Sequence, residues 1–183
     1  MLKKFGMVDC KPVSTPITTG CKLSMDDESK EVDQKPYRSM IGSLLYVTAS
    51  RQDVMQAVKL VARFQANPME KDVLAIKRIF RYLKGTIEFG VGYPKGHELS
   101  LVAYTDADWV GSIDDRRSTS ETTLYLGDFL VSWSSKKQSL VSLSTAEVEY
   151  ITAGTCCTQV IWMRQTLEDI QVKYDEPILI PVQ

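Results

Sequence analysis

The hydrophobic pattern of this 183-residue chain changes its period once, and that change limits the folds the chain can adopt. Up to about residue 85, apolar residues recur at the three- and four-residue spacing of helices. After about residue 98 they follow the two-residue alternation of strands, until a helical pattern returns at 144–170. The sequence therefore predicts an α/β (α+β) fold, in which a small helical segment precedes a sheet that carries one long helix.

Three amphipathic segments form the expected helical part, and Asn67-Pro68 and Gly85-Thr86 mark helix ends. They are residues 37–50, 53–65 and 72–85. Together they predict a small helical bundle over 37–84. Residues 1–36 hold three prolines and an acidic run, so an extended or loosely packed segment is expected there.

The second half of the chain is expected to hold strands joined by turns, followed by a helix and a last apolar strand. The expected strands are 85–96, 99–106, 119–128 and 129–135, with a hairpin at Gly127-Asp128. Ser144 and Glu147 have capping-box spacing at the start of the helix. The final apolar run is "PILIPV".

Composition excludes several classes of protein. The formal net charge is -1, so the chain is not a polycation and any basic surface must be local. No apolar run is long enough for a membrane span, and residues 1–12 hold too few apolar residues for a signal peptide to be expected there. The four cysteines lack metal-binding spacing, and His97 is the only histidine. An intracellular protein is expected, cytoplasmic or nuclear, not secreted and without a membrane partner.

Two acids stand at the end of an apolar strand in "AYTDADWVGS", residues 103–112. On a strand, Asp106 and Asp108 would point to the same side. A divalent cation such as Mg²⁺ would explain two carboxylates there. The alternative is turn chemistry, in which an Asp side chain caps the loop that follows the strand. Spacing alone leaves both interpretations open.

Longer motifs around these acids resemble a known family. "YTDADWVGSIDDRRSTS" and "VSWSSKKQSLVSLSTAEVEYITA" resemble the ribonuclease H domain of copia-like LTR retrotransposon Pol polyproteins. "YRSMIGSLLYVTASRQDVMQAVKLVARFQANP" and "AIKRIFRYLKGTIEFGVGY" resemble the segment between the reverse transcriptase thumb and that domain, and "FGMVDCKPVSTPI" resembles the end of the polymerase part. The resemblance covers essentially the whole chain. It implies a tail over 1–36, a helical thumb or connection segment over 37–97 and the N-terminal part of a ribonuclease H-like domain over 98–183.

The resemblance also implies a chemistry. The family cuts the RNA strand of RNA–DNA hybrids with two Mg²⁺ ions held by four acids, on a mixed sheet whose last strand runs parallel to the first. It implies that Asp106 is the first metal ligand and Glu149 the acid of the long helix, both with a catalytic role. Glu147 is the alternative helix acid, but its third helical position favours a capping role. Asp108 receives no role.

The chain departs from the family pattern in ways that predict an inactive, truncated ribonuclease. By register the third acid would fall at or very near position 183, which is Gln, and the fourth acid is absent. Weak Mg²⁺ binding and no hybrid cleavage are therefore expected of the chain alone. The paired acids of an RNA-directed DNA polymerase are also absent. Further departures are Glu121 at a usual Gly, Asp72 at a common His, and Pro181 inside an expected central strand.

Two basic groups are candidates for contact with nucleic acid. The first is an arc on the third helix, made of Lys77, Arg78, Arg81 and Lys84. The second is the pair Lys136 and Lys137. Either could follow the phosphates of an RNA–DNA hybrid, whereas a solvated helix face explains the first equally well.

Three functions are considered, and we expect the first of them for the ancestry of the chain and the third for its present activity. They are an enzyme fragment, a non-catalytic nucleic-acid-binding module and a remnant without function. The expected partners are nucleic acid and the rest of the Pol polyprotein. Trp133 and Trp162 lie in apolar patterns, and core packing is expected for both.

Overall fold

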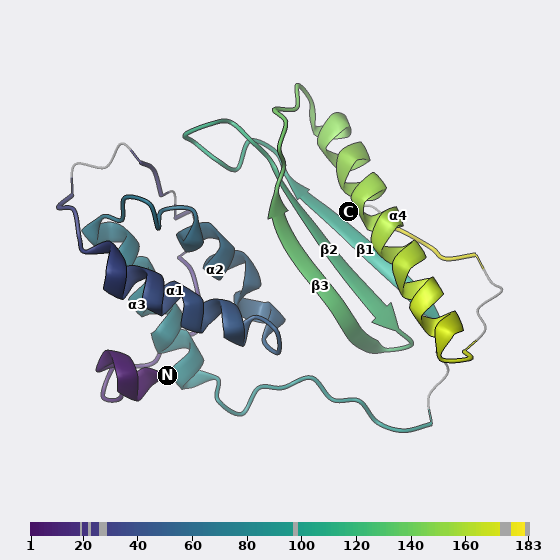
Figure 1. Ribbon diagram of the computed structural model, residues 1–183, viewed down its shortest axis with the longest axis horizontal. Helices are drawn as coiled ribbons and strands as arrows, with labels where there is room; N and C mark the ends of the chain where they lie inside the picture. Colours follow the sequence, from purple (N-terminus) through teal and green to yellow (C-terminus); the bar gives the residue numbers. More distant parts are fainter. Residues whose placement is uncertain (19, 22, 26–28, 97–98, 173–176, 182–183) are drawn as a thin grey trace. The chain divides into compact units, whose positions relative to one another are not determined.

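The computed structural model describes the chain except for residues 19, 22, 26–28, 97–98, 173–176 and 182–183. The chain divides into two units, Met1–Gly90 and Val91–Gln183. The first unit holds three α-helices, and the second holds a sheet and one long helix (Figure 1). This arrangement confirms the predicted α+β class.

The first unit is built from α1 (Gln34–Val47), α2 (Met55–Ala62) and α3 (Glu70–Gly85). Short 3-10 turns cover Leu2–Phe5 and Gln52–Val54. The predicted apolar stripes meet in a buried core whose largest side chains are Tyr37, Ile41, Leu44, Val54, Val58, Val61, Ile76, Ile79 and Phe80. All three predicted helices are confirmed, with ends that shift by a few residues.

The N-terminal segment packs on this core. Phe5 stacks on Phe80 with ring centroids 5.3 Å apart. Val13 and Ile17 are partly buried against the same cluster. Much of the segment that the sequence predicts to be extended therefore uses the helices as its packing surface.

The starts of α1 and α3 are fixed by capping and by a short backbone pairing. Asp33 accepts a hydrogen bond from the backbone N–H of Lys35 at 2.9 Å. Asp72, the departure noted in the sequence, accepts one from the N–H of Met69 at 2.9 Å and is only 2% exposed. The N–H of Val32 donates to the carbonyl of Pro68 at 3.0 Å, which ties the two helix starts together.

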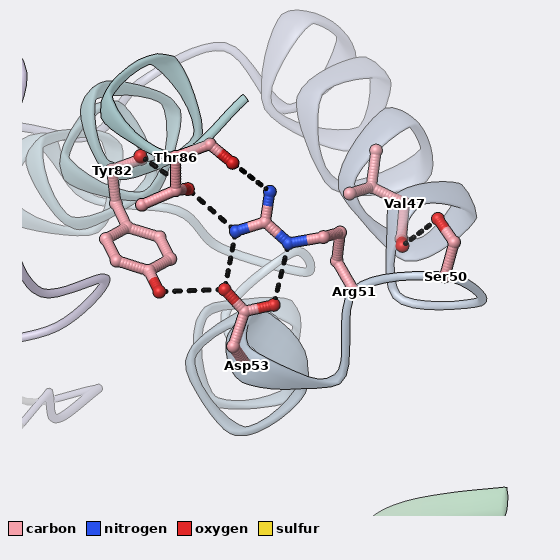
Figure 2. Close-up of polar contacts among 6 residues, drawn as sticks. All are labelled: Val47, Ser50, Arg51, Asp53, Tyr82 and Thr86. Atoms are coloured by element: carbon pink, nitrogen blue, oxygen red, sulfur yellow. Dashed lines mark hydrogen bonds and ion pairs between the residues drawn. The ribbon is translucent and has the colours of Figure 1, made fainter. Parts of the chain in front are cut away.

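An ion pair in the turn before α2 is hydrogen bonded to the end of α3 (Figure 2). Arg51 donates from Nε to Asp53 Oδ1 at 2.8 Å and from Nη1 to the carbonyl of Thr86 at 2.9 Å. The hydroxyl of Tyr82 donates to Asp53 Oδ2 at 2.8 Å. Burial opposes ionisation of Asp53, but the hydrogen bonds from Arg51 and Tyr82 outweigh it and lower the pKa of that carboxyl.

The second unit contains an antiparallel sheet of β1 (Leu101–Asp108), β2 (Thr119–Leu126) and β3 (Phe129–Lys137), in that order. The expected hairpin turns at Gly127, whose φ of 61° suits glycine. On the other side of β1, Leu179 pairs in parallel with Val102. The described part of the final apolar run thus lies beside β1 in the predicted parallel direction, as an isolated bridge and not as a fourth strand.

The long helix α4 (Thr145–Asp169) covers one face of this sheet (Figure 1). Alternate β1 residues Leu101, Ala103 and Thr105 are buried, which places them on the face that packs under α4. The helix contributes Val148, Thr152, Cys156, Val160 and Leu167. In the described part of the chain, no helix has both the length and the apolarity to cross a bilayer.

Two expectations from the sequence are wrong. Residues 85–96, all described, form no strand, and Ile87 and Phe89 are exposed because no neighbouring strand pairs with them. Trp162 is 61% exposed on α4 and so is not a core residue.

Replacing Asp53 with Asn should destabilise the first unit. The change leaves Arg51, whose side chain is 13% exposed, without its countercharge. The expected loss in the free energy of unfolding is roughly 1–3 kcal/mol at neutral pH. Because the folded pKa of Asp53 is depressed, its contribution is present above the ordinary carboxyl pKa of about 3.9 and is lost as pH falls through the folded value.

Chemical denaturation of both proteins from neutral to acidic pH measures this difference, which should shrink below about pH 4. Lys59→Ala, at an exposed position on α2, is the matched control and should change stability little. A difference that stays constant down to the acid limit would contradict the role given to the ion pair.

Candidate functional site

Asp106 lies on β1 and is exposed. Its Oδ1 accepts a hydrogen bond from the N–H of Ala107 at 2.8 Å. Because Thr105 faces α4, the pleat places Asp106 on the opposite face of the sheet. Its register partner on β2 is Glu121, which accepts a hydrogen bond from the hydroxyl of Ser135 at 3.1 Å. Two carboxylates therefore stand opposite each other on neighbouring strands.

The two candidate acids of α4 have different surroundings. The N–H of Glu147 donates to the hydroxyl of Ser144 at 3.2 Å, and its carboxylate accepts from the N–H of Leu143 at 2.8 Å. The predicted capping role of Glu147 is confirmed. Glu149 is exposed on the first turns of the helix.

A two-cation centre does not fit the residues that the structure describes. Among them, no three His, Cys, Asp or Glu side chains group closely enough to hold a metal ion. Asp106 and Glu149 supply one carboxylate each, fewer donors than two hard cations need. The described donor set therefore supports no step of metal-assisted hydrolysis.

The side chain of Asp108 lies against the turn that follows β1. A Cβ atom at Gly111 would lie 1.9 Å from Oδ2 of Asp108, so the carboxylate rests where only glycine leaves room. Next to it, Nε1 of Trp109 donates to the carbonyl of Ser142 at 3.4 Å. These contacts favour the turn interpretation for Asp108.

The two lysines at the end of β3 differ in their contacts, because Lys137 forms an ion pair and Lys136 is exposed. Nζ of Lys137 lies 2.6 Å from Oδ2 of Asp115, in the loop between β1 and β2. Burial opposes ionisation of Asp115, but Lys137 and Ser112 outweigh it and lower its pKa to about 2. Lys136 is exposed, and both lysines line a cavity of about 170 Å³ with Gln138 and Thr155.

A buried polar network lies beside this cavity, and sequence reasoning missed it. The side chain of Gln138 donates to the hydroxyl of Ser120 at 2.9 Å and to the carbonyl of Val148 at 3.3 Å. The hydroxyls of Ser120 and Thr152 lie 2.7 Å apart. The network ties β2 and the end of β3 to α4. The polar residues at alternate positions of β2, Ser120 and Thr122, were its one visible signal in the sequence.

The basic residues of α3 contact the N-terminal segment. Lys84 donates to the carbonyl of Cys10 at 2.7 Å, Arg81 to that of Lys11 at 2.7 Å, and Arg78 to the hydroxyl of Thr15 at 2.8 Å. Lys77 is exposed. The structure thus brings three of the four predicted residues together on one segment of the chain.

Charge is divided unequally between the two units. Residues 1–90 hold 15 Lys and Arg against 10 Asp and Glu, a formal net charge of +5. Residues 91–183 hold 7 against 13, a net charge of -6. The near-neutral total conceals this difference, which makes the first unit the more favourable surface for a polyanion.

Several known proteins are similar in sequence to this chain, and two of them are transposon Pol polyproteins. The Pol polyprotein of transposon RE1 from Arabidopsis thaliana is 39% identical over 98% of the chain, and that of transposon TNT 1-94 from Nicotiana tabacum is 37% identical over 98%. The chain spans 12% and 14% of the length of these relatives. An uncharacterized mitochondrial protein of Arabidopsis thaliana is 37% identical over 88% of the chain, which covers 67% of it. No family model and no solved structure matches.

Neutralising Asp106 should stabilise the second unit in a buffer with a metal chelator. Asp106→Asn removes one of two opposed carboxylates and keeps the acceptor for the N–H of Ala107. The expected gain in the free energy of unfolding is about 0.2–1 kcal/mol, measured by denaturant titration. Asp108→Asn is the matched control, because its register partner is the uncharged Thr119. A loss of stability in Asp106→Asn would show that the two acids do not repel each other.

Proposed function

Since the chain belongs to the copia-type retrotransposon Pol polyproteins, we propose that it is the segment that links the reverse transcriptase thumb to the ribonuclease H domain and carries the first part of that domain. In this proposal the first unit binds nucleic acid. The second unit carries the remains of a hydrolytic site. The rest of the polyprotein is the natural partner, because the chain spans only a small part of its Pol relatives.

The order of elements supports the assignment of the second unit. Three antiparallel strands precede a long helix, and the segment around Leu179 then pairs in parallel with β1. The resemblance noted in the sequence implies this order for a ribonuclease H-like sheet. Asp106 on the first strand and Glu149 on the helix occupy the elements expected for two of its acids.

The excess of positive charge on the first unit is the observation that carries the binding function. A formal charge of +5 and a row of basic residues on α3 suit the phosphates of an RNA–DNA hybrid. The second unit, at -6, would repel the same ligand except near Lys136 and Lys137. Non-catalytic binding is therefore the activity that the described residues support best.

Hydrolysis is proposed only as the ancestral activity. Among the described residues no three acids lie close enough together to hold a metal ion, so the isolated chain should bind Mg²⁺ weakly and leave a hybrid intact. This part of the proposal rests on the donor set and not on the extent of the chain.

Binding is tested by fluorescence anisotropy with a short labelled RNA–DNA hybrid over a range of salt concentrations. The logarithm of the association constant should fall linearly with the logarithm of salt concentration, and Lys77→Ala should reduce the slope by about 1. Arg164→Ala, which removes the partner of Glu168 on α4, is the control and should leave the slope unchanged. A slope near zero for the unmodified chain would exclude phosphate contacts.

Hydrolysis is tested by incubating the same hybrid with Mg²⁺ and the purified chain. The expected result is intact RNA at the end of the incubation. Cleavage that disappears in Asp106→Asn would contradict the proposed inactivity and would show that the chain completes its own metal site.

A further inference from the structure

The basic row of α3 is covered by one short piece of the chain, residues 10–15, here called the strap. Lys84, Arg81 and Arg78 each donate one hydrogen bond to the strap, over 2.7–2.8 Å. The strap also packs closely on the end of α3. A Cβ at Gly85 would lie 3.0 Å from Cβ of Pro12 and 3.5 Å from the carbonyl oxygen of Val13.

The strap is an incomplete partner for these side chains. Its three acceptors are two backbone carbonyls and one hydroxyl, all uncharged. Within the described part of the chain, Nε of Arg78 is buried and has no hydrogen-bond partner. The residue as a whole is half-buried, and its terminal nitrogen bonds to Thr15 at an exposed position. A guanidinium commonly pairs with a carboxylate or phosphate that accepts two of its hydrogen bonds. The row therefore retains an unused capacity to bind an anion with several oxygens.

We infer that the strap occupies the place where backbone phosphates bind, so that the strap and nucleic acid compete for Arg78, Arg81 and Lys84. This inference rests on the proposed nucleic-acid binding of the first unit and adds its regulation. Phosphate oxygens would replace the two carbonyls and the hydroxyl with charge-assisted hydrogen bonds, and a second oxygen would reach Nε of Arg78. The exposed Lys77 offers a first contact while the strap is in place.

Competition of this kind has a measurable size. The apparent dissociation constant equals the intrinsic constant divided by the fraction of molecules in which the strap is open. A strap that is closed for about 90% of the time would weaken binding about tenfold. Release of the strap should also steepen the salt dependence, because three more cations would neutralise phosphates.

A reversible disulfide between the strap and α3 gives the sharpest test. Pro12→Cys and Gly85→Cys place two Cβ atoms close to the separation that a disulfide allows. The variant also carries Cys10→Ser, Cys21→Ser and Cys157→Ser, and it keeps the buried Cys156. The same protein is then measured oxidised and reduced against a short RNA–DNA hybrid, with the cross-link confirmed by mass spectrometry. The oxidised form should bind at least about tenfold more weakly.

A wedge variant opens the strap without a change to any basic residue. Gly85→Val forces Pro12 away, because even the added Cβ is tighter than ordinary van der Waals contact. Its affinity should rise and its salt slope should steepen. Gly42→Val on α1 is the matched control, because a Cβ there meets no atom within 4 Å. Its affinity should equal that of the unmodified chain.

The outcomes separate the two claims. Equal, salt-dependent affinity of the oxidised and reduced forms would overturn the strap and leave the proposed binding function intact. Reduced protein that shows no salt-dependent binding would overturn the binding function and the strap with it. If the cross-linked variant fails to fold, unchanged affinity in Gly85→Val overturns the strap by itself.

Discussion

The alternation of side chains along β1 is the constraint on which the second unit depends. Leu101, Ala103 and Thr105 must face α4, because they and the helix share one core. The intervening residues Tyr104 and Asp106 then face the other side, opposite Thr123 and Glu121. A slip of one residue would bury a carboxylate and expose a leucine, so the apolar core fixes where the acid lies. The position of Asp106 is thus a consequence of packing, whatever its chemistry.

The face under α4 is apolar at one end and polar at the other. Leu101 and Leu124 pack with Val160 and Leu167, whereas Ser120 and Thr152 hydrogen bond at the opposite end. An apolar core tolerates small sliding of a helix, but paired hydroxyls and an amide lose hydrogen bonds if the helix shifts. The polar end therefore fixes the position of α4 along the strands of the sheet. It also holds the first turns of the helix, where Glu149 lies, at one place relative to β2.

Periodicity predicted the helices and the three paired strands, because their buried faces repeat along the chain. The prediction from periodicity failed where the burial of a residue depends on which other strand or helix packs against it, which the pattern does not specify. Residues 85–96 have β-forming side chains but no neighbouring strand, so they stay unpaired. Trp162 was misjudged because α4 carries apolar residues on its exposed side as well, including Tyr150 and Ile161. The contact of Lys84 with Cys10 joins residues 74 apart through a backbone carbonyl, and composition carries no trace of such a contact.

The division of charge between the units explains how one near-neutral chain can attract a polyanion at one unit and repel it at the other. Electrostatic attraction is screened over about 8–10 Å at ordinary salt, so a polyanion responds to the local surface and not to the total of -1. The first unit has a net charge of +5 and attracts a polyanion without the help of a bound cation. The second, at -6, presents phosphates with like charge, and only a bound cation or the lysines at the end of β3 would reverse it. In the proposed function, affinity for nucleic acid and hydrolysis would therefore depend on different residues.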